Sequence, residues 1–301
     1  MSSQITNAFV EQYSSNVEFL AQQMNSRFSG KVRMESQKGK SKFYEQIGST
    51  SAVKVTSRHQ DTPRVDTNHQ RRATYLNQYA WSDLIDELDQ VELLIDPTSA
   101  YAQNAAMAFN RAKDSEIIAA ATGTAYADTG SGNGTVSAQS LASANQIAVN
   151  YIAGGTGSNS GLTLAKLVQC KSLISAAEFP EGSKLYFAHR QKQLDNLLLN
   201  VTQVSDIHTS QVKALVAGEV NNFLGFEFIR TQLLSVASSV ATCFGYVEST
   251  LLLAIGQDSK GRVSERADKN YSTQVFMNMS IGATRMQEAG VASVACDETV
   301  A

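Results

Sequence analysis

The stretch that decides the fold is residues 95–123, IDPTSAYAQNAAMAFNRAKDSEIIAAATG, which predicts one long helix. Asp96 is a good N-cap because its carboxylate can accept a hydrogen bond from a backbone N–H of the first turn. Pro97 fits that turn, where its missing N–H costs nothing, and alanines fill the body of the helix. Gly123 can end the helix in a left-handed conformation. The expected helix at 97–122 would be a rod of about 39 Å at 1.5 Å per residue.

The segments around the start of this helix carry opposite charges. Residues 31–75 hold ten basic and four acidic side chains, whereas residues 76–130 hold nine acidic and two basic ones. Basic and acidic surfaces on copies of one chain can dock on each other, which would make these segments a subunit interface. The alternative is that both are ordinary solvated faces. The interface candidates are Arg58, Arg64, Arg71 and Arg72 on the basic side and Asp83, Asp86, Glu87 and Asp89 on the acidic side.

The basic segment predicts an extended loop of two strands at 36–76. The runs SAVKVTS at 51–57 and RRATYLNQYAW at 71–81 favour β structure, and Pro63 lies between them among polar turn formers. An isolated hairpin is marginal in water, and this one has few apolar residues of its own. We therefore expect the loop to lie on a partner surface.

An apolar stripe precedes the loop and predicts an N-terminal helix at about 5–25. The stripe recurs at three- and four-residue spacing and consists of Phe9, Tyr13, Val17, Leu20 and Met24. Two interpretations stay open. The helix packs on its own domain, or it is an arm that packs on a neighbouring subunit.

The second half of the chain mixes helices and strands. Residues 162–179 predict a helix that Pro180 ends, and residues 184–200 predict a short strand followed by another helix. Residues 233–256 form the most apolar window, but Glu248 and several Ser and Thr residues interrupt it. It therefore predicts two buried strands rather than a membrane span.

The stretch GEVNNFLGFEFIR, residues 218–230, predicts a turn followed by a strand. Gly218 and Gly225 bracket the turn, and Gly225 can take backbone angles that a side chain would forbid. Phe226 and Phe228 lie on one side of the strand that follows, because side chains alternate, and they should anchor it in the core.

The patterns of common catalytic and metal sites are missing from the sequence. The three cysteines are far apart and form no CxxC pair, so buried free thiols are expected. His59 and His69 have no ordered carboxylate motif beside them, and His189 has no GxSxG nucleophile motif to serve. There is also no GxxxxGK[ST] phosphate loop. We expect no catalytic, cofactor-binding or metal site, and no enzyme.

Length and charge narrow the class of protein further. With 301 residues and 43% hydrophobic content, the chain can bury a core. A net charge of -3 argues against general nucleic-acid binding, so any contact with DNA should be weak. The N-terminus has no basic flank leading into an apolar run, so no secretory signal is expected.

Four stretches, taken in order, carry a resemblance to a known family. They are GKSKFYEQIGS at 39–49, WSDLIDELDQVELLIDPTSAYAQNAAMAFNRAKDSEIIAAAT at 81–122, GEVNNFLGFEFIRT at 218–231 and SKGRVSERADKNYSTQVFMNMSIGATRMQEAGVASVAC at 259–296. Their order and spacing resemble the major capsid proteins of tailed bacteriophages. The chain looks most like the capsid proteins of short-tailed, T-seven-like phages, which have the Hong Kong 97-type fold.

The resemblance implies an α+β fold with four named parts. They are an N-terminal arm at 1–35, an extended loop at 36–76, a peripheral domain at 77–150 and 256–301 with its spine helix at 97–122, and an axial domain at 151–255. It also implies that copies assemble into hexamers and pentamers, which form the icosahedral head shell around phage double-stranded DNA.

Partners and location follow from the same resemblance. The partners would be other copies of the chain, a separate scaffolding protein during assembly and a portal protein, with room for a decoration protein. The chain would be made in the host bacterial cytoplasm and end in the virion, with no membrane partner. Two rivals remain: a homo-oligomeric enzyme with an oligomerisation arm, and a phage tail-tube or adhesin subunit, for which the long helix is not needed.

Overall fold

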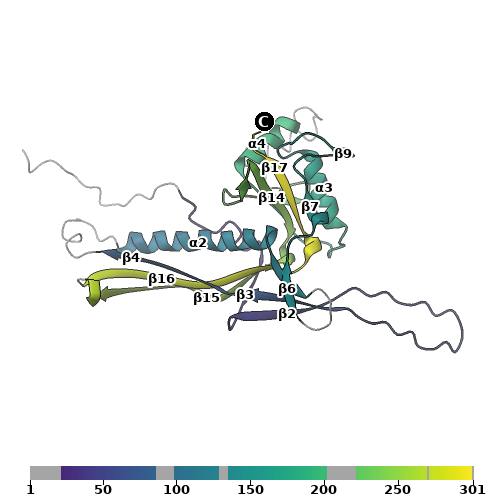
Figure 1. The fold of residues 1–301 in the computed structure, drawn as a ribbon, viewed down its shortest axis with the longest axis horizontal. Helices are drawn as coiled ribbons and strands as arrows, with labels where there is room; N and C mark the ends of the chain where they lie inside the picture. The colour runs from purple at the N-terminus through teal and green to yellow at the C-terminus, as the bar shows by residue number, and fades with distance from the viewer. Residues whose placement is uncertain (1–21, 86–97, 129–134, 202–221, 270, 300–301) are drawn as a thin grey trace, which may run out of the picture. The chain divides into compact units, whose positions relative to one another are not determined.

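The structure is a computed structural model that describes residues 22–85, 98–128, 135–201, 222–269 and 271–299 (Figure 1). The chain divides into two compact units. Unit 1 comprises Met1–Ser26, Gln78–Lys113 and Gln257–Ser280, and unit 2 comprises Arg27–Asn77, Asp114–Gly256 and Ile281–Ala301. The described residues are mostly in sheets with a few helices, which confirms the expected α+β class.

The expected long helix is α2, at Thr98–Thr122. It ends where the N–H of Gly123 donates to the carbonyl of Ala119 at 2.8 Å. Gly123 does not have a positive φ, so the expected left-handed stop is wrong. Glycine is required here for another reason, because a Cβ would lie 2.5 Å from the Ala119 carbonyl oxygen. The expected cap residues Asp96 and Pro97 lie outside the described residues.

Two long strands run through both units. β15 (Leu251–Arg266) and β16 (Ser272–Arg285) are joined by the short helix η3 (Ala267–Lys269) and belong to a sheet of order β1-β15-β16-β4. The outer strands are β1 (Arg33–Ser36), which pairs in parallel with the start of β15, and β4 (Asn77–Ile85). In unit 1, Lys113 donates to Asp258 at 2.9 Å, and this hydrogen bond lowers the pKa of Asp258.

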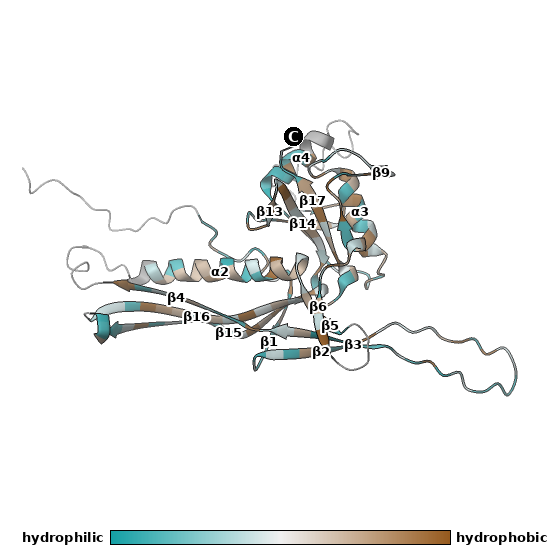
Figure 2. Cartoon of the chain, viewed as in Figure 1, coloured by the Kyte–Doolittle hydropathy of each residue, from teal (hydrophilic) through white to brown (hydrophobic). Residues whose placement is uncertain are grey.

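A mixed sheet in unit 2 has the order β11-β12-β10-β14-β17-β7. The strands are β7 (Gln146–Ile147), β10 (Leu185–His189), β11 (Asn222–Phe223), β12 (Phe226–Arg230), β14 (Val240–Val247) and β17 (Val291–Asp297), and β13 (Val236–Ala237) pairs with β14. The central strands β14 and β17 are largely apolar and buried (Figure 2), as expected of strands covered on both faces. Both β7 and β17 lie outside the range 151–255 expected for the axial domain.

Two helices accompany this sheet. α3 (Leu164–Ser175) begins at the N-cap Thr163, whose side chain accepts a hydrogen bond from the N–H of Lys166, and it packs against β14 and β17. α4 (Gln191–Val201) follows β10 directly, which confirms the expected strand and helix at 184–200. The expected helix at 162–179 is also confirmed, although it ends at Ser175, well before Pro180. The buried strands expected at 233–256 are β14 and the start of β15.

An aromatic cluster holds the segment after residue 26 against this sheet. Phe28 is fully buried and stacks on Phe244, with ring centroids 6.1 Å apart and planes 7° from parallel. Tyr246 lies next to both rings. The buried carboxylate of Asp114 in α2 accepts a hydrogen bond from the backbone N–H of Arg27 at 2.8 Å. Residues 27 and 28 therefore join the sheet to the helix.

The remaining elements of unit 2 include a second sheet of order β2-β3-β5-β6. Its strands are β2 (Ser41–Ile47), β3 (His69–Tyr75), β5 (Ala125–Asp128) and β6 (Val136–Gln139). The short elements are η1 (Ser143–Asn145), β8 (Tyr151–Ile152), β9 (Gly155–Thr156), η2 (Glu248–Thr250) and η4 (Glu288–Gly290). Residues 22–25 are not helical, and the rest of the expected helix at 5–25 lies outside the described residues.

Candidate assembly interface

The base of the extended loop is the antiparallel pair β2 and β3, whose register runs from Ser41 opposite Tyr75 to Ile47 opposite His69. The first strand of the loop is therefore at 41–47. The β-favouring run at 51–57 forms no strand within the chain, which differs from the expectation. Residues 49–69 are exposed except for Pro63, which is half-buried.

Three of the four expected interface cations are on the exposed part of this loop or at its base. Arg58 is exposed. Arg64 pairs with Asp66 at 3.2 Å, with both side chains more than 80% exposed. Arg71 pairs with Glu45 across the β2–β3 ladder at 2.5 Å, and its guanidinium lies 5.5 Å from the ring centre of Phe43.

Arg72 differs from the other three because it is buried inside its own subunit. Its side chain is 8% exposed, and Nη1 donates to Glu288 Oε1 at 2.9 Å and to the carbonyl of Arg285 at 3.3 Å. Adjacent residues of a strand point to opposite faces, so Arg71 and Arg72 cannot share one surface. The expected role of Arg72 as an interface cation is replaced by a structural one.

Arg285, at the end of β16, is the centre of this buried cluster and was not singled out from the sequence. Its side chain is fully buried, and Nη1 donates to the carbonyls of Ala120, Ala121 and Gly123 at 2.9, 3.1 and 2.9 Å. These are carbonyls at the C-terminus of α2, where a cation is favoured by the helix dipole. Nε donates to Glu288 Oε2 at 2.8 Å, so one carboxylate serves Arg285 and Arg72. The cluster ties the base of the loop to the end of the long helix.

The acidic side of the expected interface is only partly described. The carboxylate of Asp83 in β4 is half-buried and accepts a hydrogen bond from the N–H of Leu84 at 2.9 Å. The other three acidic candidates, Asp86, Glu87 and Asp89, lie outside the described residues, as does Gly218.

The turn at Gly225 has the geometry that the sequence predicted. β11 and β12 form a tight hairpin in which Phe223 lies opposite Phe226. The two turn residues, Leu224 and Gly225, have φ values of 53° and 84°, as in the two-residue turns that favour glycine. Phe226 and Phe228 are buried, and so is Phe223 beneath the turn.

The two faces of the β2-β3-β5-β6 sheet differ in burial. One face carries the buried Thr74, Arg72 and Ala127. The other face is exposed and carries large apolar side chains beside the Arg71–Glu45 pair: Phe43 is 47% exposed, Ile47 70%, Tyr75 37% and Tyr126 43%. We call these four residues the aromatic face. Exposed apolar groups that gather in this way are typical of interaction sites.

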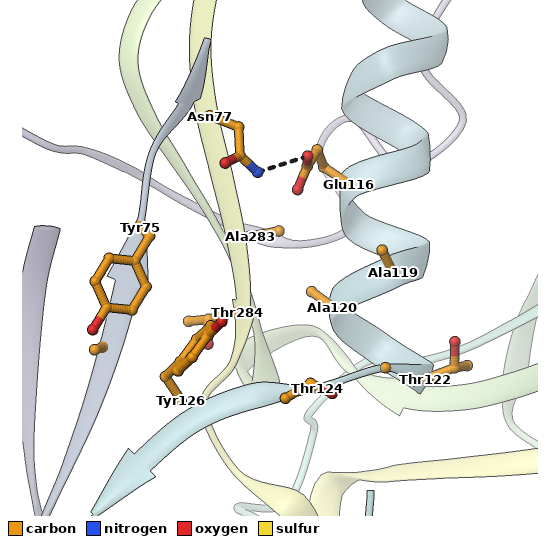
Figure 3. Close-up of a pocket in the computed structure, with 12 residues that line it drawn as sticks. Tyr75, Asn77, Glu116, Ala119, Ala120, Thr122, Thr124, Tyr126, Ala283 and Thr284 are labelled. Carbon is orange, nitrogen blue, oxygen red and sulfur yellow. Dashed lines mark hydrogen bonds between the residues drawn. The ribbon is translucent and has the colours of Figure 1, made fainter. Parts of the chain in front are cut away.

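A pocket of about 450 Å³ adjoins the aromatic face in unit 2 (Figure 3). Tyr75 and Tyr126, with ring centroids 4.9 Å apart and nearly perpendicular planes, form part of its wall. Small residues of the last turns of α2 form another part, and the one carboxylate of the lining, Glu116, accepts a hydrogen bond from Asn77 at 3.0 Å. With one carboxylate and no His, Cys or Lys, this lining offers no nucleophile paired with a base.

Buried titratable groups elsewhere in unit 2 have structural partners. Lys166 Nζ donates to four backbone carbonyls, those of Val149, Ser160, Gly161 and Ala295, at 2.8 to 3.0 Å. Burial lowers the pKa of Lys166 and of His189, whose Nδ1 lies 2.9 Å from the carbonyl of Arg190. Burial also raises the pKa of the Cys170 thiol to about 12, so this thiol is unreactive near neutral pH. Among the described residues, no three metal-ligating side chains form a cluster.

A long helix, an exposed two-stranded loop and a separate mixed sheet are features of a subunit built to contact its neighbours. The family model described as phage capsid protein matches residues 5–298, and the chain belongs to this family. Members of the family are structural proteins. The chain is a major capsid protein, whose copies form the icosahedral shell of a bacteriophage head, and hexamers and pentamers are typical of such shells.

Solved structures agree with this assignment at the level of the fold. A structure of Mycobacterium phage Che8 matches with a TM-score of 0.69 and 13% identity, covering 97% of this chain and 98% of the other. The capsid of cyanophage P-SCSP1u matches with a TM-score of 0.66 and 16% identity, covering 98% and 94%. The acidic stable capsid of Helicobacter pylori bacteriophage KHP30 matches with a TM-score of 0.69 and 11% identity, covering 99% and 98%. The fold is thus of the Hong Kong 97 type.

Two further comparisons complete this description. No curated protein matches the sequence. None of the helices that the structure describes is long and apolar enough to cross a membrane.

Proposed function

We propose that residues 48–68, the outer part of the extended loop, are the segment through which each subunit of the shell binds the next one. The observation that carries this proposal is the exposure of residues 49–69, of which only Pro63 is half-buried. A segment of this length that buries nothing in its own subunit gains its order from a neighbour, since ordering a backbone costs about 1–2 kcal/mol per residue.

Charge complementarity determines the surface of the neighbour on which this part of the loop lies. Arg58, Arg64 and Arg71 face solvent or the open side of the β2–β3 ladder, and in our proposal they meet the acidic segment of the adjacent copy. That segment holds Asp83, Asp86, Glu87 and Asp89. Each exposed pair is weak, but repetition in every subunit of a closed assembly sets the register. Arg72 takes no part in it.

Charge reversal tests the proposal. The double variant Arg58→Glu and Arg64→Glu should keep the wild-type circular dichroism spectrum and lose particle yield on a sucrose gradient. Adding Asp86→Lys and Glu87→Lys should restore part of the yield. The matched control reverses two exposed lysines outside the loop, Lys184 and Lys192, and should leave assembly intact. Equal yields from wild type and the arginine reversal would refute the electrostatic role.

We also propose which residues form each structural part of the subunit and which proteins are its partners. Residues 1–35 act as an arm, residues 36–76 as the extended loop, and 151–255, with β7 and β17 added, as the axial domain. The remaining residues, 77–150 and 256–301 without those two strands, form the peripheral domain.

A separate scaffolding protein, a portal and a decoration protein are the proposed partners, by similarity to the short-tailed phages that the sequence resembles. Expression of this chain alone should then give irregular particles, and co-expression with the phage's scaffolding protein should give uniform ones by electron microscopy.

A further inference from the structure

The run SAVKVTS at 51–57 has the composition of a strand but pairs with no strand among the described residues. Val53 and Val55 are 50% and 60% exposed, and in an extended backbone they lie on the same side. β-branched residues favour a pleated, half-buried surface, so local preference and surroundings disagree at this segment. A disagreement of this kind points to a surface that the single chain does not supply.

An open strand edge is present in the same unit. β2 is the last strand of the β2-β3-β5-β6 order, so among the described residues one of its edges pairs with no strand. The edge is seven residues long, contains no proline, and carries Phe43 and Ile47 with much of their surface exposed. A strand edge of this type is a template for pairing with another chain.

The charges on β2 do not protect this edge. Lys42 is paired with Glu35 at 2.8 Å, and Glu45 is paired with Arg71 at 2.5 Å. Both charges therefore have a partner within the subunit, which weakens the protection that a charged edge residue gives against an incoming strand. The edge remains suited to an apolar strand.

The chain's own 51–57 segment leaves β2 in the wrong direction to fill the edge. The N–H of Gly48 donates to the carbonyl of Asn68 at 2.8 Å, so the chain continues alongside the β3 limb after β2 ends. Only residues 48–50 separate β2 from the segment, and Gly48 extends the ladder with β3. A strand from another copy is free of this restriction.

We propose that residues 51–57 of one subunit add as a strand to the open edge of β2 in the neighbouring subunit. Val53 and Val55 then continue the apolar row of Phe43 and Ile47 and enlarge the aromatic face, and backbone hydrogen bonds hold the two chains together. The contact is heterologous, because the strand at 51–57 and the β2 edge are different surfaces of the chain, and such contacts form a ring where the rotation between copies closes. This inference rests on the proposed function, in which the loop reaches an adjacent subunit.

Cysteine pairs between two subunits test the register and the face. One preparation carries Phe43→Cys or Ile47→Cys, and the other carries Val53→Cys or Val55→Cys. The two are mixed before assembly and oxidised afterwards, and dimers are read on a non-reducing gel. The native Cys170, Cys243 and Cys296 are all 0% exposed and should form no background dimers.

Two matched controls separate strand pairing from mere proximity. Lys54→Cys lies between the two valines and points to the opposite face, and Val65→Cys is similarly exposed, at 44%, on the other limb of the loop. Both should give few or no dimers with position 43 or 47. Particles in which positions 53 and 55 give no dimers, or no more than 54 and 65, would overturn the inference.

A second variant tests the energetics without cysteines. Val53→Asp with Val55→Asp should leave the exposed loop of the free subunit unaffected by circular dichroism and lower the particle yield by roughly tenfold or more, since aspartate is disfavoured in strands. Val168→Asp with Val263→Asp, at two valines outside the loop that are 50% and 54% exposed, is its control. The charge reversal at Arg58 and Arg64 is scored in the same preparation. If the charge reversal lowers the particle yield but the cysteine pairs give no cross-links, only the present inference is refuted. If the cysteine pairs cross-link but the charge reversal has no effect on the yield, only the electrostatic part of the proposed function is refuted.

Discussion

Replacing Arg285 should be the most damaging single change to the folded subunit. Its guanidinium is fully buried and donates to three carbonyls at the end of α2 and to Glu288. Arg285→Met fills much of the same space but removes these donors, so buried carbonyls and part of the carboxylate are left unpaired. Each hydrogen bond to a charged group contributes about 1.5–3 kcal/mol, and removing one partner of a buried ion pair costs about 3–5 kcal/mol. We expect the free energy of unfolding to fall by about 3–5 kcal/mol.

The assay is urea unfolding of the unassembled chain, followed by far-ultraviolet circular dichroism. Arg266→Met is the control, because Arg266 pairs with Asp268 on the surface and should tolerate the same substitution with little change. Glu288→Gln keeps one acceptor oxygen but replaces the other with an NH2 group, which cannot accept a hydrogen bond from Arg72 or Arg285, and should give an intermediate loss. A stability for Arg285→Met within about 1 kcal/mol of wild type, the range of ordinary substitutions, would refute the assigned role of the cluster.

Three further changes have defined outcomes. Gly225→Val should destabilise the subunit by at least roughly 1–2 kcal/mol in urea unfolding, because Gly225 has a φ of 84°, and Gly225→Asn should cost less. Burial lowers the pKa of His189 in the folded state, so the unfolded state binds more protons below its pKa of about 6.5. Stability should fall as the pH drops from about 6.5 to 5, and His189→Gln should reduce that slope; an unchanged slope would contradict this assignment. Lys113→Gln should raise the pKa of Asp258 towards its ordinary value in an NMR titration, since the Lys113 hydrogen bond is the main cause of its lowering.

Local signals in the sequence were enough to predict the elements that form from adjacent residues. The helix α2, the strand and helix of β10 and α4, and the tight turn at Gly225 each depend on residues within one or two turns of chain. The physical reason for a glycine at one helix end was predicted wrongly. Gly123 was correctly expected to follow the end of α2, but a glycine is needed there because of its close contact with Ala119 and not because of a left-handed φ.

Partners that are distant in sequence decided what could not be predicted. Arg285 takes its carbonyls from residues 120–123, more than 160 positions away, and nothing adjacent to it in the sequence marks it as buried. Arg72 looked like its neighbour Arg71 until the strand placed them on opposite faces. The run at 51–57 was assigned to a strand on propensity alone, and among the described residues it pairs with no strand.

The position of β17 in the mixed sheet has a consequence for the timing of synthesis. β17 lies between β14 and β7, yet it is the last strand of that sheet to leave the ribosome. At about 5–20 residues per second, the roughly 40 residues between β14 and β17 take about 2–8 s to translate. Until β17 has been translated, β14 lacks one of its neighbouring strands and the sheet is incomplete. A nascent chain therefore cannot join the growing shell as a folded subunit until its translation is nearly complete.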